Sequence, residues 1–138
     1  MKCAQCLLLL AASFCTWGGF GIQSARSQDL GPGDTVRGEA VYSRCLACHA
    51  LAYDRTGPRH CGLFGRQAGT VPGFAYSQAM KNSKIIWDEK TLNVFLQNPM
   101  KVVQGTSMGY AGIPDAQERI DLIAYLKKEN ASPDCPAR

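Results

Sequence analysis

The chain has 138 residues, of which 46% are hydrophobic and 19% are charged, and its formal net charge is +4. This length suits one domain of ordinary size, and so apolar a composition excludes a largely disordered chain. The net charge is small and no basic run is longer than Lys127-Lys128, which excludes an extended nucleic-acid-binding surface. Seven cysteines are unusual for this length, so cysteine chemistry becomes the main question.

Residues 1–27 have the pattern of a cleaved export signal. Lys2 is the only charged residue before Arg26, and an apolar run at 7–12 lies between them. A stretch of small residues follows, and we expect cleavage after Ser27.

A membrane anchor is the alternative interpretation of this segment, but its strongly apolar part is too short and too interrupted to span well. A lipoprotein is disfavoured because Phe14, rather than a small residue, precedes Cys15. The mature domain would then be residues 28–138, in an oxidising compartment where unassigned thiols tend to pair. The cysteines that remain in it are Cys45, Cys48, Cys61 and Cys135.

Helical patterns alternate with long loops along the mature chain. Each predicted helix begins at a residue that can cap it. The helical segments are 34–45, 77–82, 88–99 and 115–128. Residues 50–76 and 99–114 are rich in glycine and predict loops, and no alternating strand of convincing length appears. The fold class is therefore all-α, with too few apolar residues to fill a core unaided.

Gly38 interrupts the first helical segment, where it costs about 1 kcal/mol relative to alanine. It shares a helix face with Val41, Tyr42 and Cys45, at steps of three and four residues. A glycine on such a face predicts the close approach of another element.

The run Cys45-Leu46-Ala47-Cys48-His49 is a C-x-x-C-H motif, which is the attachment signal of c-type haem. Two thiols on one helical turn can form thioethers to both vinyl groups, and the adjacent histidine offers an axial nitrogen. A redox-active disulfide would call for a βαβ context, and a zinc site would need a second ligand pair. One covalent haem c is therefore the predicted cofactor, and it would fill the missing core.

The sixth position of the iron has several candidate ligands, Met80, Met100, Met108 and His60, or it could stay open. Met108 lies in a polar, glycine-rich loop, where a role as core filler is disfavoured. A thioether ligand there would raise the reduction potential relative to two imidazoles. His60 follows His49 closely in sequence and would have trouble reaching the opposite haem face.

Short motifs along the mature chain follow the order and spacing of the class I cytochromes c. They are Gly38-x-x-x-Tyr42, the C-x-x-C-H run, Thr56-Gly57-Pro58, Gly62-Leu63-Phe64-Gly65-Arg66, Pro72-Gly73-Phe74-x-Tyr76, Trp87-Asp88-Glu89, Asn98-Pro99, Gly105-Thr106-x-Met108, Tyr110-Ala111-Gly112-Ile113 and the segment from Arg119 to Lys127. The chain resembles this electron-carrier family over nearly all of residues 28–138. The resemblance implies a cytochrome c fold, with four to five short helices and long loops wrapped around one covalently bound haem.

The resemblance also implies individual roles around the haem. Cys45 and Cys48 would attach it, and His49 and Met108 would be the axial ligands of the iron. The Pro58 carbonyl would hold the His49 ring N–H and so fix the imidazole.

The resemblance also implies that Tyr76 and Trp87 hydrogen-bond a buried haem propionate, with Arg66 nearby. A tyrosine and a tryptophan inside a small domain each need a polar partner, which agrees with these roles.

Several residues depart from the family pattern. Gln104, Ser107 and Phe95 replace a frequent proline, lysine and tyrosine, so the loop that carries Met108 is expected to be looser. His60 replaces a usual apolar residue near the haem, and we interpret it as a hydrogen-bonded, partly buried histidine rather than a ligand.

Cys61 and Cys135 are left over after haem attachment. In an oxidising compartment two leftover thiols suggest a disulfide, which is not part of the general family pattern. Such a bond would tie the C-terminal tail to the loop below the haem, and two free thiols are the alternative.

These observations favour a soluble periplasmic protein that shuttles single electrons through a haem with histidine and methionine ligands, and no enzyme. The resemblance implies redox partners such as a quinol–cytochrome reductase, a terminal oxidase, a reaction centre or a dehydrogenase. We expect a monomer without nucleic-acid binding or stable membrane insertion after cleavage. The alternatives are a haem peroxidase or small-ligand binder with an open sixth position, and a subunit dedicated to one dehydrogenase. Charges that could steer docking are Arg44, Arg55, Lys81, Lys84 and Lys101.

Overall fold

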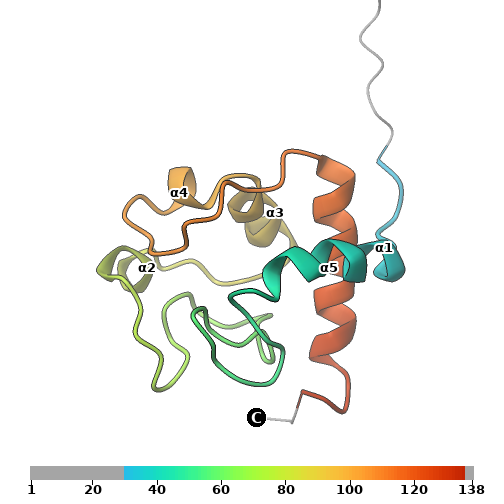
Figure 1. Ribbon diagram of the computed structural model, residues 1–138. Helices are drawn as coiled ribbons and strands as arrows, with labels where there is room; N and C mark the ends of the chain where they lie inside the picture. Colours follow the sequence, from blue (N-terminus) through green and yellow to red (C-terminus); the bar gives the residue numbers. More distant parts are fainter. Residues whose placement is uncertain (1–29, 136–138) are drawn as a thin grey trace, which may run out of the picture.

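The computed structural model describes residues 30–135 (Figure 1). Its helices are α1 (Thr35–Tyr42), the 3-10 turn η1 (Ser43–Cys45), α2 (Gln78–Asn82), α3 (Glu89–Gln97), α4 (Pro99–Val102) and α5 (Ala116–Asn130). Within this part of the chain the only β pairing is an isolated bridge between Gln67 and Ile86. The predicted all-α fold class is thus confirmed. The predicted signal peptide, residues 1–27, lies outside the described residues.

The first and last helices cross at close range, and α1 lies across the middle of α5 in Figure 1. Gly38 makes the crossing possible, because a Cβ there would lie 2.0 Å from the Asp121 carbonyl oxygen. Asp34 caps α1 by accepting hydrogen bonds from the backbone N–H groups of Val36 and Arg37. The close approach that the sequence predicts at Gly38 is therefore a helix crossing.

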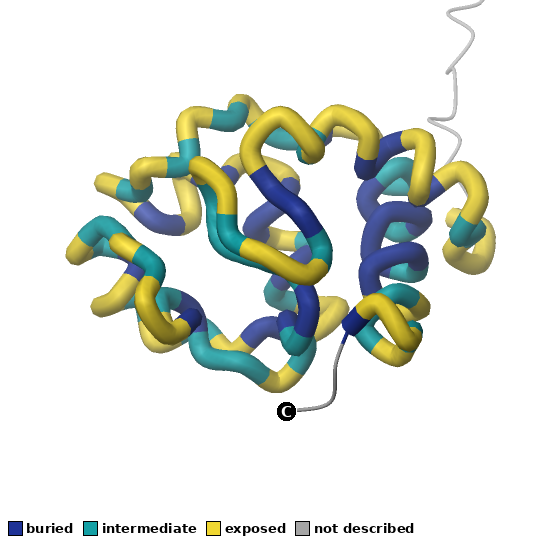
Figure 2. The backbone as a smooth tube through the Cα atoms, turned by 60° about the horizontal axis from the view of Figure 1, so that its bottom comes forward, coloured by how far each residue is buried: buried dark blue, intermediate teal, exposed yellow. Residues whose placement is uncertain are grey.

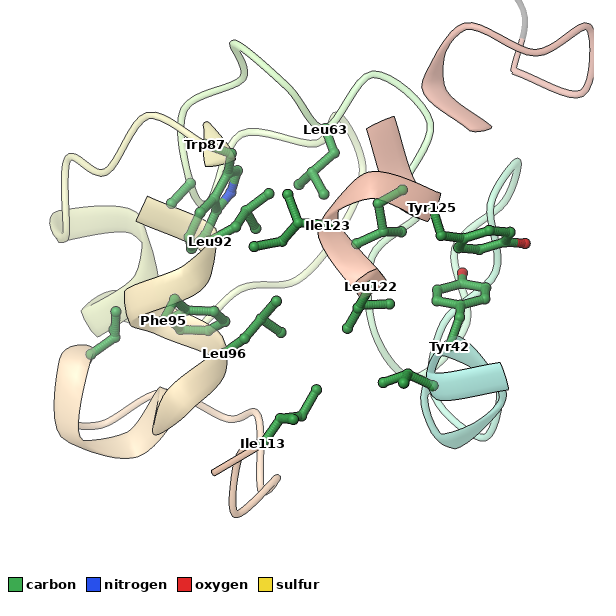
Figure 3. Packing of buried hydrophobic residues seen from close by; sticks show 14 of the residues in the cluster. Tyr42, Leu63, Trp87, Leu92, Phe95, Leu96, Ile113, Leu122, Ile123 and Tyr125 are labelled. Atoms are coloured by element: carbon green, nitrogen blue, oxygen red, sulfur yellow. The ribbon is translucent and has the colours of Figure 1, made fainter. Parts of the chain in front are cut away.

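A hydrophobic core lies between α3 and α5. Figure 3 shows Leu92, Phe95 and Leu96 of α3 facing Leu122 and Ile123 of α5. Figure 2 shows buried residues along the middle of α5, whereas the long loops alternate between buried and exposed residues.

The helix predicted over residues 88–99 ends earlier than expected. The backbone of Asn98 is extended, which stops α3 at Gln97, and the Asn98 side chain accepts a hydrogen bond from the Lys101 N–H. Pro99 then occupies the first turn of α4, where its missing N–H costs nothing. The predicted loop 99–114 therefore begins with one helical turn.

The end of α5 is joined to the loop that follows α1. The Asn130 side chain accepts from the Leu63 N–H at 2.7 Å and donates to the His60 carbonyl at 3.1 Å. Beyond it, Cys135 meets Cys61 with their Cα atoms 5.1 Å apart, a separation that suits a disulfide. Among the described residues, no helix is long and apolar enough to cross a membrane.

Candidate functional site: a cavity lined by the C-x-x-C-H motif

A cavity of about 360 Å³ lies between the helices and the long loops. Its lining brings together every residue to which the sequence assigns a haem-binding role. These residues are Cys45, Cys48, His49, Pro58, Arg66, Tyr76, Trp87 and Met108. The other walls are mainly apolar side chains of α2, α3 and α5. The core that the sequence leaves unfilled is this cavity.

The C-x-x-C-H motif forms a tight turn directly after η1. The N–H groups of Cys48 and His49 both donate to the Cys45 carbonyl, at 3.0 and 2.9 Å. This turn brings the two cysteines and the histidine to one wall of the cavity. The two thiols are not bonded to each other, and burial raises the pKa of the Cys45 thiol.

The His49 imidazole is buried and held by its edge. Its Nδ1 lies 2.8 Å from the Pro58 carbonyl oxygen, which can only accept a hydrogen bond. Nδ1 therefore carries the proton, and Nε2 keeps a free lone pair that can bind a metal. Gly57 packs against the ring so closely that a Cβ there would lie 2.4 Å from Cε1. Burial lowers the pKa of His49, which favours the neutral, ligating form.

Met108 reaches the cavity from a loop that lies between two buried residues, Val103 and Ile113. Its own N–H donates to Thr106 Oγ1 at 3.2 Å, and the Ile113 N–H donates to the Leu96 carbonyl at 2.8 Å. The Met108 side chain packs against the core and is partly buried. This arrangement places a thioether among the residues that line the cavity.

The buried guanidinium of Arg119 holds the chain after this loop. It donates to the carbonyl oxygens of Ile113 and Pro114 at 2.7 and 2.8 Å, and to Asn93 Oδ1 at 2.8 Å. Sequence reasoning missed this residue, because a single arginine within a predicted amphipathic helix is usually exposed.

The other candidates for the sixth ligand divide into two groups. Met80 and His60 line the cavity, whereas Met100 is not among the lining residues and is 51% exposed. Met80 is buried in the core cluster on α2. His60 is partly buried and its Nδ1 lies 3.1 Å from the Tyr42 hydroxyl, as we predict for a hydrogen-bonded histidine.

Two of the predicted propionate-binding residues, Arg66 and Tyr76, lie in the long loop between η1 and α2. The third, Trp87, lies just before α3. Burial raises the pKa of the Tyr76 hydroxyl, which therefore keeps its proton. The Trp87 ring is buried and packs at a tilt on Phe95, with ring centroids 4.9 Å apart. Arg66 donates to the carbonyl oxygens of Cys61 and Arg59, at 2.9 and 3.0 Å, which holds its cationic head beside the cavity.

These residues fit a c-type haem. Two thiols, an imidazole with a free Nε2 and a thioether line one largely apolar cavity, and hydroxyl, indole and guanidinium groups lie in the same lining. Gly57 and the Pro58 carbonyl restrict the orientation of His49, which is typical of a metal ligand held by a hydrogen bond to its other ring nitrogen.

Two of the predicted docking charges have intramolecular partners. The Arg44 guanidinium makes a two-pronged ion pair with Glu118, at 2.6 and 2.8 Å. Arg55 donates to the Leu46 carbonyl at 2.5 Å. The guanidinium groups of Arg44 and Arg55 are therefore already bound within the molecule.

Comparison with known proteins gives a consistent result. The family model described as "Cytochrome c" matches residues 35–129. Cytochrome c of Euglena viridis is 48% identical over 98 residues, which cover 69% of this chain and 96% of the relative. Cytochrome c2 of Blastochloris viridis is 46% identical over 101 residues, covering 71% and 80%.

Among solved structures, cytochrome cH from Methylobacterium extorquens matches with a TM-score of 0.68 and 40% identity. The match covers 70% of this chain and 99% of that one. Sequence, fold and cavity agree that the chain belongs to the cytochrome c family, as a class I c-type cytochrome that carries one covalently bound haem c and transfers electrons rather than catalysing a reaction.

Proposed function

We propose that the chain is an exported, periplasmic carrier of single electrons whose haem is attached by Cys45 and Cys48 and ligated by His49 and Met108. The observation that carries this proposal is the shared cavity, whose lining contains both cysteines, the free imidazole nitrogen and the thioether. Bound haem c would supply an iron that gains and loses one electron.

The protein's own residues would keep that exchange fast and selective. The Pro58 carbonyl holds the His49 imidazole, and the largely apolar walls of the cavity would keep water away from a bound haem. A site that keeps one geometry in both redox states needs little rearrangement when an electron arrives. With both axial positions filled by side chains, no substrate could reach the iron.

Tyr76, Trp87 and Arg66 would hold the haem propionates. All three line the cavity, and Arg66 is positioned by the carbonyl oxygens of Cys61 and Arg59. A cation held at this place would offset the negative charge of a carboxylate that is removed from water.

Location and partners follow as further parts of the proposal. An export signal over residues 1–27, cleaved after Ser27, would deliver the chain to the periplasm, where Cys61 and Cys135 would form a disulfide. Residues 28–138 would act as a monomer that exchanges electrons with a reductase, an oxidase, a reaction centre or a dehydrogenase.

The ligand assignment is tested by replacing each methionine that the sequence offers. Methionine sulfur on ferric haem gives a weak far-red absorption band, so Met108→Ala should lose the band and bind added imidazole readily. The reduction potential should fall, because a thioether ligand raises it. Met100→Ala is the matched control, since Met100 is exposed and does not line the cavity.

Two results would contradict the assignment. If Met80→Ala rather than Met108→Ala abolished the band, the sulfur ligand would come from α2. If the wild-type protein lacked the band and bound cyanide at once, the sixth position would be open, as in a small-ligand binder.

A further inference from the structure

A second imidazole covers the face of the His49 ring. The His60 ring lies almost parallel to it, with ring centroids 4.4 Å apart and an angle of 21° between the planes. The Pro58 carbonyl holds the Nδ1 edge of His49, and Gly57 packs closely against the ring. A flat ring at stacking distance further restricts the tilt of the imidazole.

His60 is itself fixed on several sides. The ring Nδ1 of His60 lies 3.1 Å from the Tyr42 hydroxyl oxygen. The backbone N–H of His60 donates to the carbonyl oxygens of Ala50 and Leu51, both at 3.1 Å. Its carbonyl accepts from the Asn130 side chain at 3.1 Å. The backbone of His60 is thus held by the loop and by α5, and its ring is held by the Tyr42 hydroxyl on α1.

Tyr42 extends this arrangement into the helix crossing. Its ring packs on the Tyr125 ring of α5, with centroids 5.3 Å apart, and the two rings lie side by side in Figure 3. Rings in contact thus run from His49 through His60 and Tyr42 to Tyr125. The orientation of the His49 plane is coupled through them to the packing of α1 on α5.

We propose that His60 is a positioning residue, which fixes the plane of the His49 imidazole by stacking on it and is itself held by Tyr42. The proposal rests on the proposed role of His49 as an iron ligand. The plane of an axial imidazole decides which iron d orbitals it overlaps, and so sets the magnetic anisotropy of the ferric haem. An aliphatic side chain at position 60 would fill the space without imposing a plane.

The test uses the haem-loaded protein and three variants. His60→Leu removes the flat ring and the contact with Tyr42, His60→Phe keeps a flat ring, and Tyr42→Phe removes only the hydroxyl. The readouts are the g values of the ferric protein by electron paramagnetic resonance and the hyperfine-shifted haem methyl signals by NMR. Circular dichroism and the far-red band show that each variant is folded and keeps both ligands.

We expect His60→Leu to change the g values and the spread of the methyl signals, while the far-red band is retained. His60→Phe should restore most of the wild-type pattern, and Tyr42→Phe should shift it in the direction of His60→Leu by a smaller amount. A merely structural role would lower stability without moving these signals.

Two results would overturn the proposal. Folded His60→Leu with wild-type g values and methyl shifts would show that the stack does not set the plane. Equal changes in His60→Leu and His60→Phe would show that a flat ring is not what matters. A wild-type protein without a low-spin, histidine-ligated ferric signal would contradict the proposed function itself, which separates the two failures.

Discussion

Asp121 is a buried carboxylate that ties the start of α1 to the middle of α5. It accepts from the Arg37 Nε at 2.7 Å and the Asp34 N–H at 2.8 Å, and Gln117 donates to it at 3.0 Å. The hydrogen bond from Arg37 is the main reason that its pKa falls from the usual 3.8 to about 2. The charged form of Asp121 is therefore favoured in the folded protein.

This depressed pKa predicts a pH-dependent contribution to stability. The contribution is complete above about pH 4, where the carboxyl is also ionised in the unfolded chain, and it disappears as the pH falls towards 2. Asp121→Asn should lower the free energy of unfolding at pH 7 by about 2 kcal/mol, from the conversion of about 1.4 kcal/mol per pKa unit. Urea unfolding of the parent protein and of Asp121→Asn, between pH 2 and 7, measures this difference in unfolding free energy.

Glu39→Gln is the control for this experiment, because Glu39 is an exposed acid on the same helix. It should leave the unfolding free energy nearly unchanged across the same range. A constant difference between Asp121→Asn and the parent protein at all pH values would refute the proposed linkage.

Residues with a chemical signature could be assigned from sequence, and residues whose role depends on geometry could not. The C-x-x-C-H motif carries its chemistry in its spacing, so Cys45, Cys48 and His49 are placed by the sequence at the cavity that the structure contains. Asp121 and Arg119 have no such pattern, since their burial depends on contacts with other helices, made through Arg37 of α1 and Asn93 of α3.

At the scale of elements, the α1–α5 crossing depends on a missing side chain. An added Cβ at Gly38 would lie 2.0 Å from the Asp121 carbonyl oxygen and 2.7 Å from the Tyr125 Cβ. Gly38→Ala must push the helices apart, and we expect a loss of about 3 kcal/mol of unfolding free energy. This loss outweighs the gain of about 1 kcal/mol in helix propensity.

Thermal and urea unfolding, followed by circular dichroism, measure the effect of this substitution. Val36→Ala is the matched control on α1, since Val36 is 75% exposed and should change stability little. Similar losses in the two variants would show that the crossing tolerates extra volume, contrary to its geometry.

Helix starts were more predictable than helix ends. Asp34, Ser77, Asp88 and Asp115 cap helices where the sequence predicts, because a capping side chain acts on the N–H groups that follow it directly. The sequence predicts that Pro99 ends one helix and that a loop follows, whereas in the structure Asn98 ends α3 and caps α4, which Pro99 begins.

At the scale of the whole molecule, the contact between Cys61 and Cys135 closes a long loop, with a sequence separation of 74. If the disulfide forms as we propose, Cys61→Ser with Cys135→Ser should lower the unfolding free energy by about 3 kcal/mol. The chain-entropy value is about 4 kcal/mol, but covalently attached haem already restrains the unfolded chain. Guanidinium unfolding of the haem-loaded proteins measures the difference.

Thiol alkylation followed by mass spectrometry provides the control. Denatured holoprotein should take up no label until a reductant is added, and should then take up label at Cys61 and Cys135. Labelling before reduction would show free thiols and would contradict the disulfide.

The two walls of the cavity are braced unequally. The wall with His49 is tied to the end of α5 through Asn130, whereas the N–H groups of Thr106 and Met108 make only local hydrogen bonds, to the Val103 carbonyl and to Thr106 Oγ1. Gly109 has nothing within 4 Å of an added Cβ. Local opening there should cost less free energy than global unfolding, so backbone amides of this loop should exchange their hydrogens first. A transient release of Met108 would then expose the iron while α1, α3 and α5 stay packed. The stability of this one loop would therefore decide whether the protein only carries electrons or also binds an added ligand at the iron.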